Sequence, residues 1–269
     1  MELEQLKRLV EVVARLRSPV NGCPWDSVQT NMSIRRYLIE EAGEYLDALE
    51  AGDDYAVRDE LGDLLLQIVL NAQIAQDEDR FSLEDVAKSE ADKMVRRHPH
   101  VFGESDATTP EEYRRQWEEI KRTEKGYSER KSAIDGVPRS LPALARAQKK
   151  LSKAARAGFE WPSLGDAVAK VDEELAEVRQ ALAEGDKGAI AEELGDLLIA
   201  IAKICNLQEL QAEEILHAAI RKFDRRFRKV EEMAASAGYS KLGDCPISRM
   251  MDSWKVAKAE EKDDASTRA

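Results

Sequence analysis

The chain has 269 residues, of which 43% are hydrophobic, 35% charged and only 6% aromatic. This length is enough for two domains, and the composition is typical of an all-α protein with long charged helix faces. The net charge of −12 argues against sequence-independent binding to nucleic acid polymers. It does not exclude a small anion that arrives with its own metal.

The three cysteines, Cys23, Cys205 and Cys245, are odd in number and far apart in the sequence. They indicate no disulfide framework and favour a reducing compartment. The N-terminus is too charged for a signal peptide, and no uncharged apolar run approaches the roughly 18 residues that a membrane span needs. We therefore expect a cytoplasmic protein with no membrane partner.

Apolar residues at helical spacing predict a first helix from about residue 2 to 17. The loop that follows contains Cys23-Pro24-Trp25-Asp26, for which plugging a bundle end and contacting a substrate are equally plausible roles. Glycine and proline between residues 126 and 142 predict a linker. A last helix carries Trp254 and is expected to fray after about Lys258. The other expected helices cover about residues 33–50, 54–76, 82–97, 110–125, 144–157 and 212–235, and two more carry the acidic motifs of the second half.

Two acidic motifs occur twice in the chain. Glu173-Glu174-Leu175-Ala176-Glu177 is followed by Glu193-Leu194-Gly195-Asp196. In the first half, Glu40-Glu41-Ala42-Gly43-Glu44 is followed by Glu60-Leu61-Gly62-Asp63. Matched positions differ by 133 residues, as 174 − 41 and 196 − 63 show. This repeat indicates a duplicated domain, because its period is far longer than that of a solenoid repeat.

The spacing of the acids predicts a metal site. Residues three apart share a helix face, and Gly185 with Asp186 is a suitable connection between two helices. The resulting hairpin would bring four carboxylates together, and these repel one another unless a cation lies among them. Oxygen ligands favour Mg²⁺, with Mn²⁺ as an alternative. The candidate ligands are Glu174, Glu177, Glu193 and Asp196 in the second half and Glu41, Glu44, Glu60 and Asp63 in the first.

A single pair of acids at this spacing usually marks only an acidic surface. Two features favour a site instead. The residues after each second motif, 64–70 and 197–202, are apolar nearly all round, which is typical of a buried helix. In addition, Gly62 and Gly195 stand inside helices, where glycine costs about 1 kcal/mol relative to alanine, so each is expected to permit a close approach.

A basic helix supplies a candidate phosphate site. Lys222, Arg225 and Arg226 share one helix face, and Lys93, Arg96 and Arg97 have the same spacing in the first half. Such a cluster alone is more often a solvated surface. Beside a metal held by carboxylates, however, it suits a polyphosphate, because the cations neutralise the phosphate charge.

These motifs, together with Gly22-Cys23-Pro24-Trp25-Asp26 and Arg97-His98-Pro99-His100-Val101-Phe102-Gly103, resemble those of bacterial MazG proteins, which belong to the all-α NTP pyrophosphatase superfamily. The resemblance covers nearly the whole chain. Asn31 departs from it, since many members have histidine there, and the second half lacks the Cys-Pro-Trp segment. The resemblance implies an all-α fold of two tandem MazG-like helical domains with dimeric four-helix-bundle cores. We expect residues 1–125 to form the first domain, 126–142 a linker, 143–258 the second domain, which is the main catalytic candidate, and 259–269 a polar tail.

The resemblance also implies a Mg²⁺-dependent homodimer that hydrolyses NTP or dNTP to the monophosphate and pyrophosphate, with broad base specificity and a role in nucleotide-pool housekeeping. The eight candidate ligands above would hold metal. Glu173 and Glu192 would be outer groups or the base for water, with Glu173 also near the substrate. Lys222, Arg225, Arg226 and Trp254 would contact the nucleotide, with Lys170 nearby, and Lys222 and Arg225 would stabilise charge on the leaving pyrophosphate.

Two other functions are alternatives for such a helical chain. A di-iron bundle needs Glu-x-x-His, and none of His98, His100 and His217 stands three residues after a candidate glutamate. A non-catalytic helical dimer that binds a protein or nucleotide effector is the stronger alternative. The complete sets of acids in both halves count against it.

Overall fold

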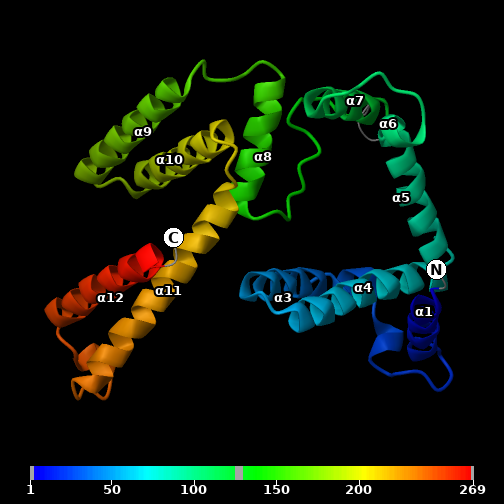
Figure 1. Ribbon diagram of the computed structural model, residues 1–269, viewed down its shortest axis with the longest axis horizontal. Coiled ribbons are helices and arrows are strands. Elements are labelled where there is room, and N and C mark those ends of the chain that lie inside the picture. Colours follow the sequence, from blue (N-terminus) through cyan, green and yellow to red (C-terminus); the bar gives the residue numbers. More distant parts are fainter. Residues whose placement is uncertain (1–2, 125–129, 268–269) are drawn as a thin grey trace. The chain divides into compact units, whose positions relative to one another are not determined.

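The computed structural model describes residues 3–124 and 130–267, with side chains up to residue 261. Within these ranges every regular element is a helix, which confirms the all-α prediction. The chain divides into two compact units, Met1–Glu124 and Lys125–Ala269 (Figure 1). Residues 125–129, where the predicted linker begins, lie outside the described part. None of the described helices combines the length and apolarity needed to cross a membrane.

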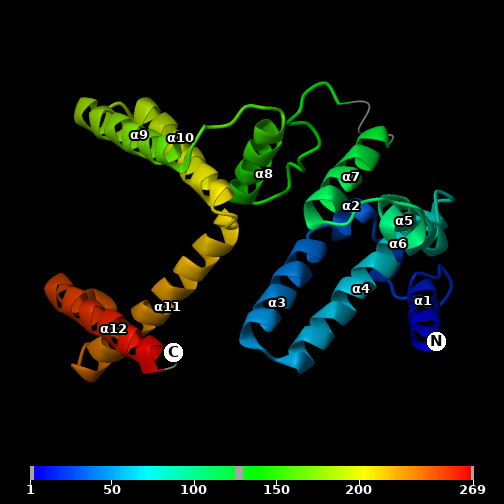
Figure 2. The ribbon, with the colours of Figure 1, turned by 45° about the horizontal axis from the view of Figure 1, so that its top comes forward.

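The first unit is built around two long antiparallel helices, α3 and α4, which lie side by side in Figures 1 and 2. Its core contains Val13 of α1, Ile34 of α2, and Val69, Leu70 and Ile74 of α4. The core therefore joins the N-terminal helix to the hairpin. The helices are α1 (Glu4–Leu16), α2 (Asn31–Ile34), α3 (Tyr37–Ala51), α4 (Asp54–Asp77), α5 (Leu83–Arg97), α6 (Pro99–Phe102) and α7 (Pro110–Thr123), with a short 3₁₀ helix, η1 (Asp26–Val28).

One predicted helix in this unit was wrong. The helix expected over residues 33–50 is two helices, because α2 begins after the Thr30 cap and the chain turns before α3. α5 ends at Arg97, and Pro99 begins the short helix α6, where a first-turn proline loses no hydrogen bond. Asn31, the residue that departs from the family pattern, has a structural role: its amide donates to the backbone oxygen of Asn71 at 3.0 Å and so ties α2 to α4.

The loop between α1 and α2 is fixed to the bundle at several points. The Arg17 guanidinium donates to the backbone oxygens of Asp26 and Gln29 and pairs with Asp77 at 2.7 Å. Gly22 is required for the tight turn, because a Cβ there would lie 2.1 Å from the backbone oxygen of Ser18. The loop thus holds Trp25 in one place on the first unit.

The second unit repeats the helical hairpin with α9 and α10, which also lie side by side (Figures 1 and 2). Its small core of Ala202, Cys205 and Ala212 packs against α8. Lys203 of α10 is fully buried, and its ammonium pairs with Glu160 at 2.7 Å. The helices are α8 (Ala143–Arg156), α9 (Leu164–Glu184), α10 (Lys187–Leu207), α11 (Ala212–Ser236) and α12 (Ile247–Thr267), with a short 3₁₀ helix, η2 (Leu242–Asp244).

The C-terminal helix is longer than predicted. Fraying was expected after Lys258, but α12 continues to Thr267. Glu261 gives the physical reason, because its carboxylate accepts hydrogen bonds from Arg225 and Arg226 of α11 and so holds the last described side chains against the neighbouring helix.

Candidate active site

The acidic hairpin of the second unit is made by its turn. Gly185 ends α9 in the left-handed conformation, with φ of 74°, and the Asp186 carboxylate accepts hydrogen bonds from the backbone of Gly188 and Ala189 at the start of α10. The first unit has the same turn, with Gly52 at φ of 68° and Asp53 as the cap of α4. These turns confirm the connection expected between the helices, and they set the acids of the two helices opposite one another.

Three carboxylates meet in the second unit. Oxygens of Glu174, Glu177 and Glu193 all lie within 4.8 Å of one another. Burial raises the pKa of Glu193, and the charges of Glu177, Glu174, Glu192 and Asp196 raise it further. Asp196 therefore acts on the cluster electrostatically but does not belong to the close group of three. The site consists of hard oxygen donors that repel one another, which is the donor set that Mg²⁺ or Mn²⁺ prefers.

Lys170 is the direct partner of this cluster. Its ammonium lies 2.7 Å from a Glu173 oxygen and 2.8 Å from a Glu174 oxygen. The hydrogen bonds to Glu173 and Glu174 raise the pKa of Lys170, so it stays charged. Glu174 is only 5% exposed, and this ammonium balances its buried charge. Lys170 and Glu173 thus lie beside the candidate ligands, whereas Glu192 contributes through its charge on Glu193.

The first unit has an equivalent cluster. Oxygens of Glu41, Glu44 and Glu60 lie within 4.8 Å of one another. Burial, followed by the charges of Asp63, Glu44 and Glu60, raises the pKa of Glu41, and burial with neighbouring acids also raises the pKa of Glu60. One Glu60 oxygen is buried without a hydrogen-bond partner. A buried carboxylate oxygen without a partner fits a metal ligand, because a cation would satisfy it.

The basic residues form a separate group in one chain. α11 leaves the hairpin and pairs with α12 (Figures 1 and 2). Arg225 and Arg226 both donate to Glu261, at 3.1 and 2.8 Å, and Arg226 lies 5.9 Å from the ring centre of Trp254. Within the described residues, no ion pair joins Lys222 or either arginine to the three carboxylates. The sequence predicted that the carboxylates and the basic residues of α11 form one continuous site. In the single chain these two groups lie apart.

The same basic arrangement recurs in the first unit. Arg96 and Arg97 both pair with Glu124, and Arg97 lies 5.2 Å from the ring centre of Trp117. These hydrogen bonds lower the pKa of Glu124 to about 2. Glu124 and Glu261 were missed by sequence reasoning. A repeated spacing in the sequence points to both residues: each half has a glutamate seven residues after a tryptophan, as 124 − 117 and 261 − 254 show.

The apolar residues that follow the acidic motifs are not all buried in one chain. Ala200 and Ala202 are buried as expected, but Leu198 is 52% exposed and Ile201 is also exposed. In the first unit, Leu65 and Ile68 are exposed beside buried Val69 and Leu70. The expectation of a fully buried helix was therefore wrong for the isolated chain. One hairpin has too little surface to cover an apolar helix on every side.

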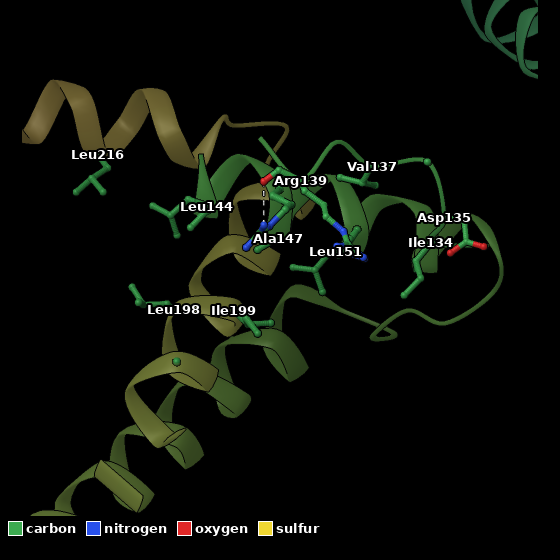
Figure 3. Close-up of a pocket in the computed structure, with 15 residues that line it drawn as sticks. Ile134, Asp135, Val137, Arg139, Leu144, Ala147, Leu151, Leu198, Ile199 and Leu216 are labelled. Carbon is green, nitrogen blue, oxygen red and sulfur yellow. Dashed lines mark hydrogen bonds between the residues drawn. The ribbon is translucent and has the colours of Figure 1, made fainter. Parts of the chain in front are cut away.

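A cavity of about 850 Å³ opens next to this exposed surface in the second unit. Figure 3 shows Leu198 and Ile199 of α10 and Leu144 and Leu151 of α8 converging on it, while residues 134–139 form its rim. Arg146 donates to the backbone oxygen of Arg139 and holds this rim. Gly195 lines the same cavity and has open space where its Cβ would be. The close approach expected at this glycine is therefore not made by any described part of the chain.

The fold and the two acidic clusters define an all-α protein with duplicated carboxylate sites. Residues 29–102 and 165–231 match the MazG nucleotide pyrophosphohydrolase domain. The chain is 44% identical over 265 residues to the nucleoside triphosphate pyrophosphohydrolase of Escherichia coli K12, covering 97% of this chain and 100% of that protein. It is 39% identical over 252 residues to the nucleoside triphosphate pyrophosphohydrolase/pyrophosphatase MazG of Thermotoga maritima, covering 94% and 95%. The chain therefore belongs to the MazG family and is a hydrolase of the nucleotide pyrophosphohydrolase class.

Other relatives match only part of this chain. The nucleoside triphosphate pyrophosphohydrolase of Mycobacterium tuberculosis is 40% identical over 167 residues, which cover 61% of this chain and 50% of that protein. The matches to the Escherichia coli and Thermotoga maritima proteins, by contrast, extend over nearly the whole of both chains.

Proposed function

We propose that this protein hydrolyses nucleoside triphosphates and their deoxy forms to the monophosphate and pyrophosphate with Mg²⁺, or alternatively Mn²⁺. The observation that carries the proposal is the close group of three carboxylates in each unit of a chain that belongs to this family. Relatives that match almost the full chain carry the name nucleoside triphosphate pyrophosphohydrolase. We further propose broad base specificity at the second unit, a role in nucleotide-pool housekeeping, and a cytoplasmic location.

Glu174, Glu177 and Glu193, with Asp196 beside them, would hold the metal ion. When bound, this ion would neutralise phosphate charge and acidify a water molecule. Lys170 holds Glu173 and Glu174 in place through its two ion pairs. Glu173 or Glu192 would accept the proton from the attacking water.

The leaving pyrophosphate gains negative charge, which Lys222, Arg225 and Arg226 would stabilise. Arg226 lies near the face of Trp254, so the same surface offers a cation for phosphate and an aromatic ring for the base. Glu261 occupies both arginines in the isolated chain, and a triphosphate would have to displace it.

We also propose a homodimer. The exposed apolar side chains on α10 and the neighbouring cavity are suited to a hairpin of a second copy, which would complete a four-helix bundle. Contact with a second copy would also explain why no described residue of the chain fills the space beside Gly195. We expect Leu198→Glu to give monomers in sedimentation experiments while the helix content is retained. An unchanged dimer would contradict this interface.

The activity is tested by measuring pyrophosphate release from NTPs with Mg²⁺. We expect Glu174→Gln and Glu193→Gln to remove most release, because each neutralises one of the three clustered carboxylates. Glu184→Gln is the control, since Glu184 lies on the same helix as Glu174, is exposed and accepts a hydrogen bond from Gln180, outside the group of three carboxylates. No release by the folded, dimeric parent protein would instead favour a helical dimer that binds an effector. Equal release by Glu174→Gln would contradict the ligand assignment.

A further inference from the structure

The carboxylate groups of the two units contain matching acids. At the offset of 133 residues, each acid of one group has an acid at the same position of the other. In each unit, three of these acids are glutamates whose oxygens lie within 4.8 Å of one another. The two groups therefore carry the same formal charge, and any difference in cation binding has to come from the residues around them. The matched acids are Glu40, Glu41, Glu44, Asp59, Glu60 and Asp63 in the first unit and Glu173, Glu174, Glu177, Glu192, Glu193 and Asp196 in the second.

The second group has a cation of its own within the chain. The Lys170 ammonium lies 2.8 Å from a Glu174 oxygen and 2.7 Å from a Glu173 oxygen. Glu174 is one of the three clustered glutamates, and its side chain is only 6% exposed. Lys170 stands three and four residues before these glutamates on α9, so both pairs form within one helix turn. One candidate ligand of the second group is thus already neutralised by the protein.

The first unit has a tyrosine where the second has this lysine. Tyr37 corresponds to Lys170, and its phenol oxygen accepts a hydrogen bond from Arg36 at 2.6 Å. The Arg36 guanidinium is held over the same ring, 4.6 Å from its centre. Glu41, the residue that corresponds to Glu174, is hydrogen-bonded to the neutral amide of Gln67. A neutral donor therefore takes the place that a cation has in the second group.

The clustered glutamates of the first unit lack a counter-charge. Among the described residues, no ion pair includes Glu41, Glu44 or Glu60. One Glu60 oxygen is buried without a hydrogen-bond partner, and no oxygen of the second group is in that state within the described side chains. A buried carboxylate oxygen without a partner costs free energy that a bound cation would recover. The first group therefore has both the charge and the free oxygen to take an ion from solution.

We propose that the two carboxylate groups take up their divalent ion under different conditions. The first unit binds Mg²⁺ or Mn²⁺ without nucleotide, whereas the second unit binds the ion only together with a nucleoside triphosphate. Lys170 sets this difference, because its ammonium and a divalent ion repel each other when both contact Glu174. A triphosphate brings oxygens that can accept the ammonium and so free the carboxylate for the ion. The inference rests on the proposed function, because the second unit has to receive a triphosphate.

This difference gives the two ions separate roles. Glu41 and Glu44 lie on α3 and Glu60 lies on α4, so an ion bound by all three joins the two helices of the first hairpin. Such an ion stabilises the first unit whether or not substrate is present. In the second unit the ion that acidifies a water molecule is held only when a phosphate is beside it. Lys170 thus keeps the second site from holding an ion before its substrate arrives.

The test counts the Mn²⁺ ions that the metal-free, full-length protein binds. Equilibrium dialysis against MnCl₂ alone should show one tight ion per chain, and the second site should be at least about tenfold weaker. Glu60→Gln should remove the tight ion, whereas Glu193→Gln should leave it in place, because Glu193 belongs to the second group. Adding the non-hydrolysable α,β-methylene analogue of ATP should bring a second tightly bound ion to the parent protein.

Variants of Lys170 test its role directly. Lys170→Tyr gives the second unit the residue of the first, and it should bind two tight ions per chain without nucleotide. Lys170→Gln removes the same charge with a smaller change in shape, and it replaces the first variant if circular dichroism shows that the tyrosine disturbs the fold. Lys187→Gln is the matched control, because Lys187 is an exposed lysine at the start of α10, and it should bind Mn²⁺ like the parent protein.

Three results would overturn the inference: two equally tight ions in the parent protein without nucleotide, no tight ion without nucleotide, or no gain of an ion in a folded Lys170 variant. Pyrophosphate release by the parent protein is measured separately. If the parent releases pyrophosphate but one of these results is found, only the difference between the two units is wrong. If it neither releases pyrophosphate nor binds the ATP analogue, the proposed function is wrong.

Discussion

Glu261 occupies the arginines that are proposed to bind phosphate, and replacing it should separate stability from substrate affinity. Glu261→Gln keeps the shape of the side chain and removes its charge. Burial raises the pKa of Glu261, but hydrogen bonds from Arg226 and Arg225 outweigh it and the pKa is lowered, so the group is ionised at neutral pH. In the free protein its carboxylate therefore competes with any anion for the two guanidinium groups.

The size of the effect follows from the exposure of the three side chains. Arg226 and Glu261 are 15% and 27% exposed, whereas Arg225 is 63% exposed and largely screened by solvent. An ion pair of this kind contributes about 1 kcal/mol. Losing it should lower the free energy of unfolding by that amount. It should also lower the KM for the triphosphate about fivefold, because the phosphates no longer have to displace a carboxylate.

The assay combines pyrophosphate release over a range of NTP concentrations with thermal unfolding followed by circular dichroism. Glu260→Gln is the matched control, because Glu260 is the adjacent acid and makes only an exposed contact with Lys229 at 3.5 Å. A KM that stays the same or rises in Glu261→Gln would refute the reasoning. It would mean that Glu261 positions the arginines for the substrate and does not compete with it.

Three other predictions concern stability. In metal-free protein, Glu193→Gln should raise the melting temperature, because the raised pKa of Glu193 reflects an ionised form that is disfavoured beside the other carboxylates. In the presence of Mg²⁺, the same variant should lower pyrophosphate release at least about 100-fold, because it removes a candidate metal ligand. The metal-free parent protein should also gain stability as pH falls from 7 towards that raised pKa, and an unchanged or lower melting temperature in the variant would contradict this. For Glu124, whose pKa is lowered from 4.5 to about 2, the sign is opposite: its stabilisation is complete above about pH 4.5 and is lost as pH falls towards 2. The full pKa difference corresponds to about 3 kcal/mol of folding stability, which solvent screening at half-exposed Arg96 reduces to about 1–2 kcal/mol. Glu124→Gln should therefore lose less stability than the parent protein between pH 5 and 2, as measured by acid unfolding. Gly22→Ala should destabilise the first unit by about 1–3 kcal/mol, because the new Cβ would lie 2.1 Å from the backbone oxygen of Ser18. Gly43→Ala is the control: its Cβ would enter open space on a helix, so this change should be neutral or stabilising. Both variants are compared by chemical denaturation, and equal effects would contradict the loop geometry at Gly22.

The sequence alone determined the helical class, the duplication and, in each unit, the three glutamates that meet; Asp63 and Asp196, predicted as fourth ligands, lie outside the close groups. Helical periodicity and the glycine–aspartate turn are local properties, so Gly185 and Asp186 were sufficient to predict that Glu174 and Glu193 would lie on facing helices. Spacing also showed which residues share a helix face, because that depends only on 3.6 residues per turn. Spacing did not show which apolar residues of α4 and α10 are buried, because burial depends on which other helices pack against them.

Tertiary structure decided the partners of each charged and polar group. Glu124 and Glu261 lie 27 and 35 residues from Arg97 and Arg226, and no local pattern shows which carboxylate a guanidinium will contact. The hydrogen bond between Gln67 and Glu41 depends in the same way on how α4 packs against α3. Contacts between segments far apart in sequence depend on how the helices pack, and helix packing has several solutions of similar energy for one apolar pattern. The acids could therefore be found from the sequence, whereas the charged groups that hold them, and the carboxylates that occupy the arginines, could be found only from the structure.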